Sequence, residues 1–208
     1  MKYKIGYVDE DPDQVLLYQM DLRDNFDVIG YNITKHMPIS ELIDQIYSSD
    51  IDMLMIDYFL VDNNVLLYNG DEVARKFREI KPQFPMIIFT NEQADAFPNV
   101  EIPNIIYDKV EANENLKHFE DILVKNIVDY KNLIGRNKVV LQNLINKGEE
   151  KGLNSEEKHR LIEAQLELYR LDKRTNEIPI HLYDITKFEK LEAAKTEALK
   201  YVESLKAK

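Results

Sequence analysis

A chain of 208 residues with 44% hydrophobic residues and a net charge of −11 has an ordinary globular composition, with room for one domain and an appendage or for two small domains. The absence of cysteine excludes disulfides, thiolate metal sites and a cysteine nucleophile, and it fits a reducing compartment. Because no stretch approaches the roughly 18 apolar residues of a membrane span, and the N-terminus carries acids where an export signal is apolar, we expect a cytoplasmic protein that enters no membrane.

Short apolar runs alternate with amphipathic stretches through the first half of the chain. The runs that we predict to be strands are residues 3–8, 28–33, 52–57, 86–90 and 104–107. The stretches that we predict to be helices between them include residues 12–26, 38–49 and 70–80. Continuous apolar runs, separated mostly by helical stretches, are typical of parallel strands that are buried on both faces. The sequence therefore predicts an α/β domain with a doubly wound, five-stranded parallel sheet.

The second half of the chain has few glycines and prolines, and its apolar residues recur at helical spacing. One helix is predicted from Leu116 to about Lys147, a second from Ser155 to about Lys173, and a last one from Asp184 or Thr186. The 3,4 spacing of apolar residues along 116–144 suits either a coiled coil between two chains, which would make a homodimer, or a helical bundle within one chain. The sequence thus predicts an all-α extension.

Polar side chains stand where the predicted strands end. Asp9 and Glu10 follow the first strand, Asp57 ends the third, Thr90 ends the fourth, and Lys109 follows the fifth. Functional groups of an open parallel sheet gather at the carboxyl ends of its strands, and carboxylate oxygens suit Mg²⁺. Asp57 could then act as metal ligand and nucleophile, with the metal and Lys109 neutralising a phosphoryl group to which Thr90 donates a hydrogen bond.

Four segments in this order resemble a known family, the CheY-like receiver domains of bacterial two-component response regulators. The segments are VDEDP (8–12), IDYFL (56–60), IIFTN (87–91) and YDK (107–109). No single segment is specific, but their order and their placement at strand ends are. The resemblance covers about residues 2–125.

The resemblance implies a role for each residue at the strand ends. Asp9 and Glu10, with Asp57, would hold Mg²⁺. Asp57 would accept a phosphoryl group from a phosphohistidine of a sensor histidine kinase or a phosphotransfer protein. Thr90 and Lys109 would register the phosphorylated state. We therefore expect a two-component signalling protein, not an enzyme with turnover.

The chain departs from the family pattern in several places. The stretch 60–69 is longer than the usual loop and partly apolar, so we expect it to cover the site or to bind a partner. Pro98 and Pro103 predict a fourth helix that is short or missing. Ile106 stands where the family often has a switching aromatic residue, and Val110 stands where it usually has proline.

A rival interpretation is a haloacid-dehalogenase-like phosphatase with Asp9 as nucleophile and Asp11 as acid or base. That family needs a further acidic pair at a strand end after the lysine, whereas only Glu120 and Asp121 follow here, in a helical stretch. The rival also gives Asp57 no role, and Asp11 suits a helix N-cap. We therefore favour the receiver interpretation.

The charge distribution bears on what the tail binds. Residues 131–208 hold 16 Lys/Arg against 13 Asp/Glu, a balance of +3, which leaves −14 for residues 1–130. No compact basic helix for DNA recognition is evident. We predict a receiver-like phosphoacceptor domain at 1–125 and a helical region for output, protein interaction or dimerisation at 126–208, with no DNA binding. The alternative is a DNA-binding transcriptional response regulator.

Overall fold

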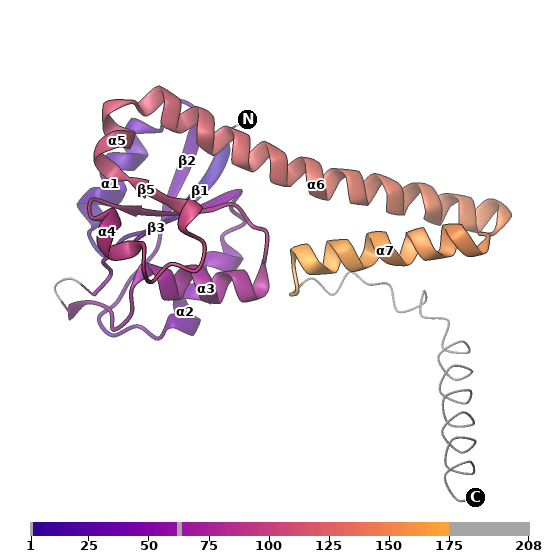
Figure 1. Cartoon of the computed structure of the whole chain (residues 1–208), viewed down its shortest axis with the longest axis horizontal. Coiled ribbons are helices and arrows are strands. Elements are labelled where there is room, and N and C mark those ends of the chain that lie inside the picture. Colours follow the sequence, from indigo (N-terminus) through magenta and orange to yellow (C-terminus); the bar gives the residue numbers. More distant parts are fainter. Residues whose placement is uncertain (1, 62–63, 175–208) are drawn as a thin grey trace, which may run out of the picture. The chain divides into compact units, whose positions relative to one another are not determined.

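A computed structural model describes residues 2–61 and 64–174. Its centre is a five-stranded parallel sheet in the order β2-β1-β3-β4-β5 (Figure 1). The strands are β1 (Tyr3–Val8), β2 (Phe26–Gly30), β3 (Met53–Asp57), β4 (Met86–Thr90) and β5 (Ile106–Asp108). This order is the flavodoxin-like variant of the doubly wound sheet, in which the winding direction reverses between β1 and β3. The predicted α/β architecture is confirmed.

The helices alternate with these strands and then continue alone. They are α1 (Pro12–Asp21), α2 (Ile39–Ser48), α3 (Gly70–Ile80), α4 (Gln93–Ala96), η2 (Pro103–Ile105), α5 (Lys109–Glu114), α6 (Leu116–Lys151) and α7 (Ser155–Leu171). The expected shortening of the fourth helix is confirmed by the four residues of α4. All these elements lie within one compact unit that ends at Lys173.

The predicted bounds of the second strand were wrong. The strand begins at Phe26, two residues earlier than expected, and ends at Gly30, three residues earlier. Phe26 is buried and pairs with Tyr3 of β1, so its side chain belongs to the sheet although charged residues surround it in sequence. The pairing with β1 ends at Gly30, which lies beside Tyr7.

Two hydrophobic cores cover the two faces of the sheet. Helices α2 and α3 bury Leu42, Ile46, Val73 and Phe77 against one face. The other face packs against α1 and the first part of α6, which buries Phe119, Leu123 and Ile127. The start of α6 is therefore part of the sheet domain. The predicted boundary between residues 125 and 126 falls inside this continuous helix, and as a division of function it stays a prediction.

Helices α6 and α7 pack against each other as an antiparallel hairpin. Lys147 near the end of α6 pairs with Glu157 near the start of α7, while the hydroxyl of Tyr130 reaches the carbonyl of Leu171 at the other end. Asn154 and Glu157 form a capping box that starts α7. Of the two alternatives for the apolar seam, the structure shows packing within the chain, and association of two chains stays a prediction.

The end of α7 returns to the sheet domain. Asp172 accepts a hydrogen bond from Tyr47 at the end of α2 (3.3 Å) and pairs with Lys81 at the end of α3 (3.3 Å). The backbone N–H of Lys173 donates to the carbonyl of Ile80. The start of α6 and the end of α7 are thus both anchored to the sheet domain. The predicted last helix, from Asp184 or Thr186, lies outside the described residues.

No helix within residues 2–61 and 64–174 has the length and apolarity that crossing a membrane requires.

Candidate functional site

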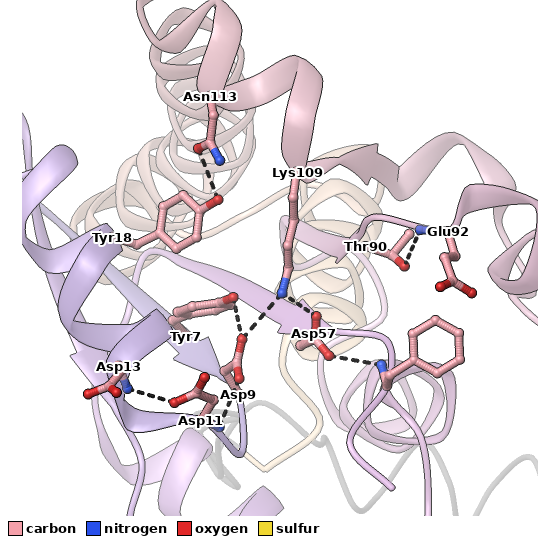
Figure 2. A network of polar contacts seen from close by, with 11 residues as sticks. Tyr7, Asp9, Asp11, Asp13, Tyr18, Asp57, Thr90, Glu92, Lys109 and Asn113 are labelled. Carbon is pink, nitrogen blue, oxygen red and sulfur yellow. Dashed lines mark hydrogen bonds and ion pairs between the residues drawn. The ribbon is translucent and has the colours of Figure 1, made fainter. Parts of the chain in front are cut away.

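The carboxyl ends of β1, β3 and β5 bring three of the predicted side chains into contact (Figure 2). The ammonium group of Lys109 lies 2.5 Å from Oδ1 of Asp57 and 3.4 Å from Oδ2 of Asp9. The strand register explains the meeting, because Val8 pairs with Ile56 and Asp57 pairs with Phe89. Asp9 and Asp57 therefore leave the sheet at neighbouring points of one edge.

Backbone N–H groups hold both carboxylates. Phe59 donates to Oδ2 of Asp57 and Asp11 donates to Oδ1 of Asp9, each at 2.9 Å. The side chain of Asp11 accepts the N–H of Asp13 and caps α1, as the sequence predicted. Each carboxylate thus has one oxygen fixed by the turn that follows its strand and one oxygen facing Lys109.

Thr90 lies at the same edge but makes a different contact. Its side chain is buried, and its Oγ1 accepts the backbone N–H of Glu92 at 3.1 Å (Figure 2). The oxygen is occupied as an acceptor, so the hydroxyl proton remains free to donate. Ile106 and Tyr107 occupy β5, and the ring of Tyr107 packs toward Phe119 of α6 at 6.2 Å.

The start of α3 lies close to the end of β3, to which residues 58–69 connect it. Gly70 donates its N–H to the carbonyl of Tyr58, and a β-carbon on Gly70 would lie 2.2 Å from the carbonyl oxygen of Asp57. Within this stretch Leu60 and Leu66 are buried in the core beside α2 and α3, whereas Leu67 is 72% exposed. The predicted role of residues 60–69 in covering the site or binding a partner stays a prediction.

Burial dominates the electrostatics of Asp57. Its side chain is almost completely buried, and this desolvation raises the pKa of Asp57 above its usual value. The ammonium of Lys109 lowers the pKa, and the negative charge of Asp9 raises it again. Two buried carboxylates and one cation therefore leave an excess of negative charge at the strand ends.

The carboxylates fit a divalent cation through the chemistry of their donors. Within the part of the chain that the structure describes, no three His, Cys, Asp or Glu side chains gather as a metal site. Asp9 and Asp57 nevertheless share one cationic partner, and Mg²⁺ typically binds proteins through one or two carboxylates while keeping several waters. The geometry supports these two residues as candidate ligands, and the predicted part of Glu10 stays a prediction.

Tyr7 is a further residue of the site that was not predicted from the sequence. Its hydroxyl donates a 2.5 Å hydrogen bond to Oδ2 of Asp9, the oxygen that Lys109 also contacts (Figure 2). Side chains two residues apart on a strand point to the same face, so the position of Tyr7 two residues before Asp9 was a usable signal. A tyrosine within an apolar run reads as a core residue, which is why the run itself gave no hint of a polar role.

Asp57→Asn is expected to raise thermal stability at pH 7. The folded-state pKa of Asp57 is raised above its unfolded value, so Asp57 favours folding only while it is protonated, and this contribution is lost as the pH rises through the folded-state pKa. Asparagine removes the cost of a buried charge. Melting curves between pH 3 and pH 8 should show a gain at neutral pH that fades as the pH falls toward 3.8. Asp121→Asn, which changes an exposed carboxylate on α6, is the control, and a gain independent of pH would contradict the assignment.

Similarity to known proteins is found among solved structures. No protein-family model matches this chain, and no curated protein matches it. Among solved structures, a response regulator receiver protein from Sinorhizobium medicae is 23% identical with a TM-score of 0.41, covering 52% of this chain and 82% of its own.

Two further structural neighbours are response regulators as well. TrrA of Thermotoga maritima, in complex with the histidine kinase ThkA, is 19% identical with a TM-score of 0.43 and covers 59% of this chain and 98% of its own. RcsB of Salmonella typhimurium is 14% identical with a TM-score of 0.47 and covers 80% of this chain and 92% of its own. The sheet of this chain has the flavodoxin-like strand order 2-1-3-4-5.

Proposed function

We propose that this protein is a response-regulator-like signalling protein that accepts a phosphoryl group on Asp57. The observation that carries the proposal is the contact of Lys109 with both Asp57 and Asp9 at the carboxyl edge of the sheet. A nucleophilic carboxylate needs a neighbouring cation when it attacks an anionic group, since two negative charges otherwise repel each other in a desolvated site. Lys109 meets this need.

The proposed reaction transfers a phosphoryl group from a phosphohistidine to Asp57. A carboxylate oxygen of Asp57 forms the new bond to phosphorus as the P–N bond breaks, and the electron pair of that bond stays on the imidazole nitrogen of the donor. Lys109 balances charge on the phosphoryl oxygens, and the hydroxyl of Thr90 donates a hydrogen bond to one of them. Asp9 and Asp57 would hold Mg²⁺, which when bound supplies further neutralisation of the transferred group.

The partners follow from this chemistry. A sensor histidine kinase or a phosphotransfer protein would be the donor, and the hairpin of α6 and α7 would contact a protein that receives the signal. The expectation that the protein has no enzymatic turnover is part of the proposal, because the phosphoryl group ends on the protein's own carboxylate. We also propose that the protein is cytoplasmic, which the absence of cysteine fits.

The described tail favours a protein partner over DNA. Two of its cations are paired with acids: Lys147 pairs with Glu157, and Arg170 pairs with Glu167. Such local pairs belong to a solvated helix surface and not to a stripe of cations that follows phosphates. These pairs favour a protein partner over the alternative of a DNA-binding transcriptional regulator.

Two residues that the phosphatase alternative requires, Asp11 and Glu120, make structural contacts instead. Asp11 caps α1 through the N–H of Asp13, so its carboxylate already has a structural partner. Glu120 lies on α6 and not at a strand end, and its carboxylate accepts a hydrogen bond from the side chain of Asn25 at 3.1 Å. The receiver interpretation uses Asp57 and needs neither residue.

Phosphorylation of the full chain is expected to depend on Asp57 and on Mg²⁺. The protein is incubated with Mg²⁺ and acetyl phosphate, and intact-mass spectrometry should show one added phosphoryl group on wild type and none on Asp57→Asn. A chelator should prevent the modification. If wild type and Asp57→Asn stay equally unmodified, and wild type also binds no beryllofluoride, the proposed function is wrong.

A further inference from the structure

Tyr7 combines complete burial with a polar contact to the site. It lies on β1, its side chain has no exposed surface, and its hydroxyl donates to Oδ2 of Asp9 at 2.5 Å. A phenol buried in an apolar core needs a hydrogen-bond acceptor, and the acceptor here is a carboxylate that faces Lys109 and Asp57 (Figure 2). The hydroxyl therefore acts on the functional edge of the sheet.

The surroundings of Tyr7 fix its ring. It packs edge-on against Tyr18 at 5.4 Å and against Phe89 at 6.5 Å. Burial and the negative charge of Asp9 raise the pKa of Tyr7, so the phenol keeps its proton and remains a donor. A rigid ring with a permanent donor can hold a carboxylate in one orientation.

The carboxylate of Asp9 is in fact held from two sides. The backbone N–H of Asp11 fixes Oδ1, and the hydroxyl of Tyr7 fixes Oδ2. The plane of the carboxylate is thereby set before a cation arrives. Without Tyr7, only Lys109 would contact Oδ2 among the side chains drawn in Figure 2, and Lys109 is also engaged by Asp57.

We propose that Tyr7 is a positioning residue that orients Asp9 for a divalent cation and so sets the affinity of the site for Mg²⁺. This inference rests on the proposed function, because it assigns Asp9 as a ligand. Groups that hydrogen-bond to metal ligands orient them, and their loss typically weakens metal binding about 10- to 100-fold. Tyr7 acts through Asp9 and does not contact the transferred group.

Tyr18 provides a matched control. It is a buried tyrosine of the same aromatic group, packed against Tyr7 and against Phe89 at 5.1 Å. Its hydroxyl donates to Oδ1 of Asn113 at 3.1 Å and not to a carboxylate of the site (Figure 2). Tyr18→Phe and Tyr7→Phe thus remove the same group from neighbouring rings, but only the second change affects Asp9.

Titration calorimetry of the full chain with Mg²⁺ tests the inference. Tyr7→Phe is expected to weaken Mg²⁺ binding by about 10-fold or more, whereas Tyr18→Phe should bind as wild type does. Equal affinities of Tyr7→Phe and wild type would overturn the inference, and so would an equal loss in both variants, because that would reflect disturbed packing. Circular dichroism establishes that each variant is folded under the conditions of the titration.

The tyrosine absorbance at saturating Mg²⁺ is a readout that does not depend on affinity. Mg²⁺ at Asp9 should perturb the absorbance of the phenol that is bonded to it, giving a difference band in wild type and Tyr18→Phe that Tyr7→Phe lacks. Should Tyr7→Phe not fold, an equal band in wild type and Tyr18→Phe supports the inference, and no band in either overturns it. If wild type binds no Mg²⁺, both the inference and the metal site are overturned. If wild type takes up the phosphoryl group and Tyr7→Phe binds Mg²⁺ with the affinity of wild type, only the role of Tyr7 is overturned.

Discussion

Gly70→Ala is expected to lower the free energy of unfolding by about 3 kcal/mol, at the upper end of the cost of overpacking a core. The added β-carbon would lie 2.2 Å from the carbonyl oxygen of Asp57 and 2.9 Å from Cγ2 of Ile56. Both belong to β3, every residue of which is buried, so neither can move aside without displacing this strand. Urea denaturation of the two proteins measures the loss.

The same substitution should also reduce phosphoryl uptake in the intact-mass experiment, because relief of the clash requires the backbone of Asp57 to shift. Gly135→Ala is the control, since a β-carbon at Gly135 in α6 meets nothing within 4 Å. In a helix interior that change is expected to be neutral or to stabilise by up to about 1 kcal/mol. Equal effects of the two substitutions would contradict the steric account of Gly70.

The sheet could be predicted from sequence because most of its strands contain a compact apolar run. The runs at 3–8 and 86–90 match β1 and β4 residue for residue. The prediction failed at β2, where Phe26 follows Asp24 and Asn25 and precedes Asp27. Only the pairing of Phe26 with Tyr3 identifies this residue as part of the sheet, and that pairing is a tertiary contact that local sequence does not encode.

Some residues of the candidate site could also be predicted from sequence, and others could not. Asp9, Asp57 and Lys109 could be grouped from sequence, because the carboxyl ends of parallel strands meet at one edge whatever the details of packing. For Tyr7 the sequence offered only its spacing from Asp9, and for Gly70 no signal, since their roles depend on one hydrogen bond and one close backbone approach. The return of α7 to Tyr47 and Lys81 through Asp172 also escaped prediction, because it joins residues that lie far apart in the chain.

Removal of the ammonium group of Lys109, which contacts both Asp9 and Asp57, should also lower stability strongly. Lys109→Met is expected to destabilise the protein by about 3 kcal/mol at pH 8, because removal of one partner from a buried ion pair leaves the other charge uncompensated. The side chains of Lys109, Asp9 and Asp57 are only 12%, 3% and 10% exposed, so solvent screens them little. Methionine keeps the length and the apolar stem of the lysine.

The pH dependence of this loss separates charge from packing. Protonated Asp57 needs no cation, and its pKa is already raised by burial in the wild type, so the loss in Lys109→Met should shrink as the pH falls from 8 toward 4. Urea denaturation at several pH values measures it. Lys125→Met is the matched control, because Lys125 pairs with Asp129 on the exposed surface of α6 and such pairs contribute little. A loss in Lys109→Met that stays constant with pH, or that Lys125→Met reproduces, would show that the ammonium of Lys109 does not neutralise the buried carboxylates on which the proposed phosphoryl transfer depends.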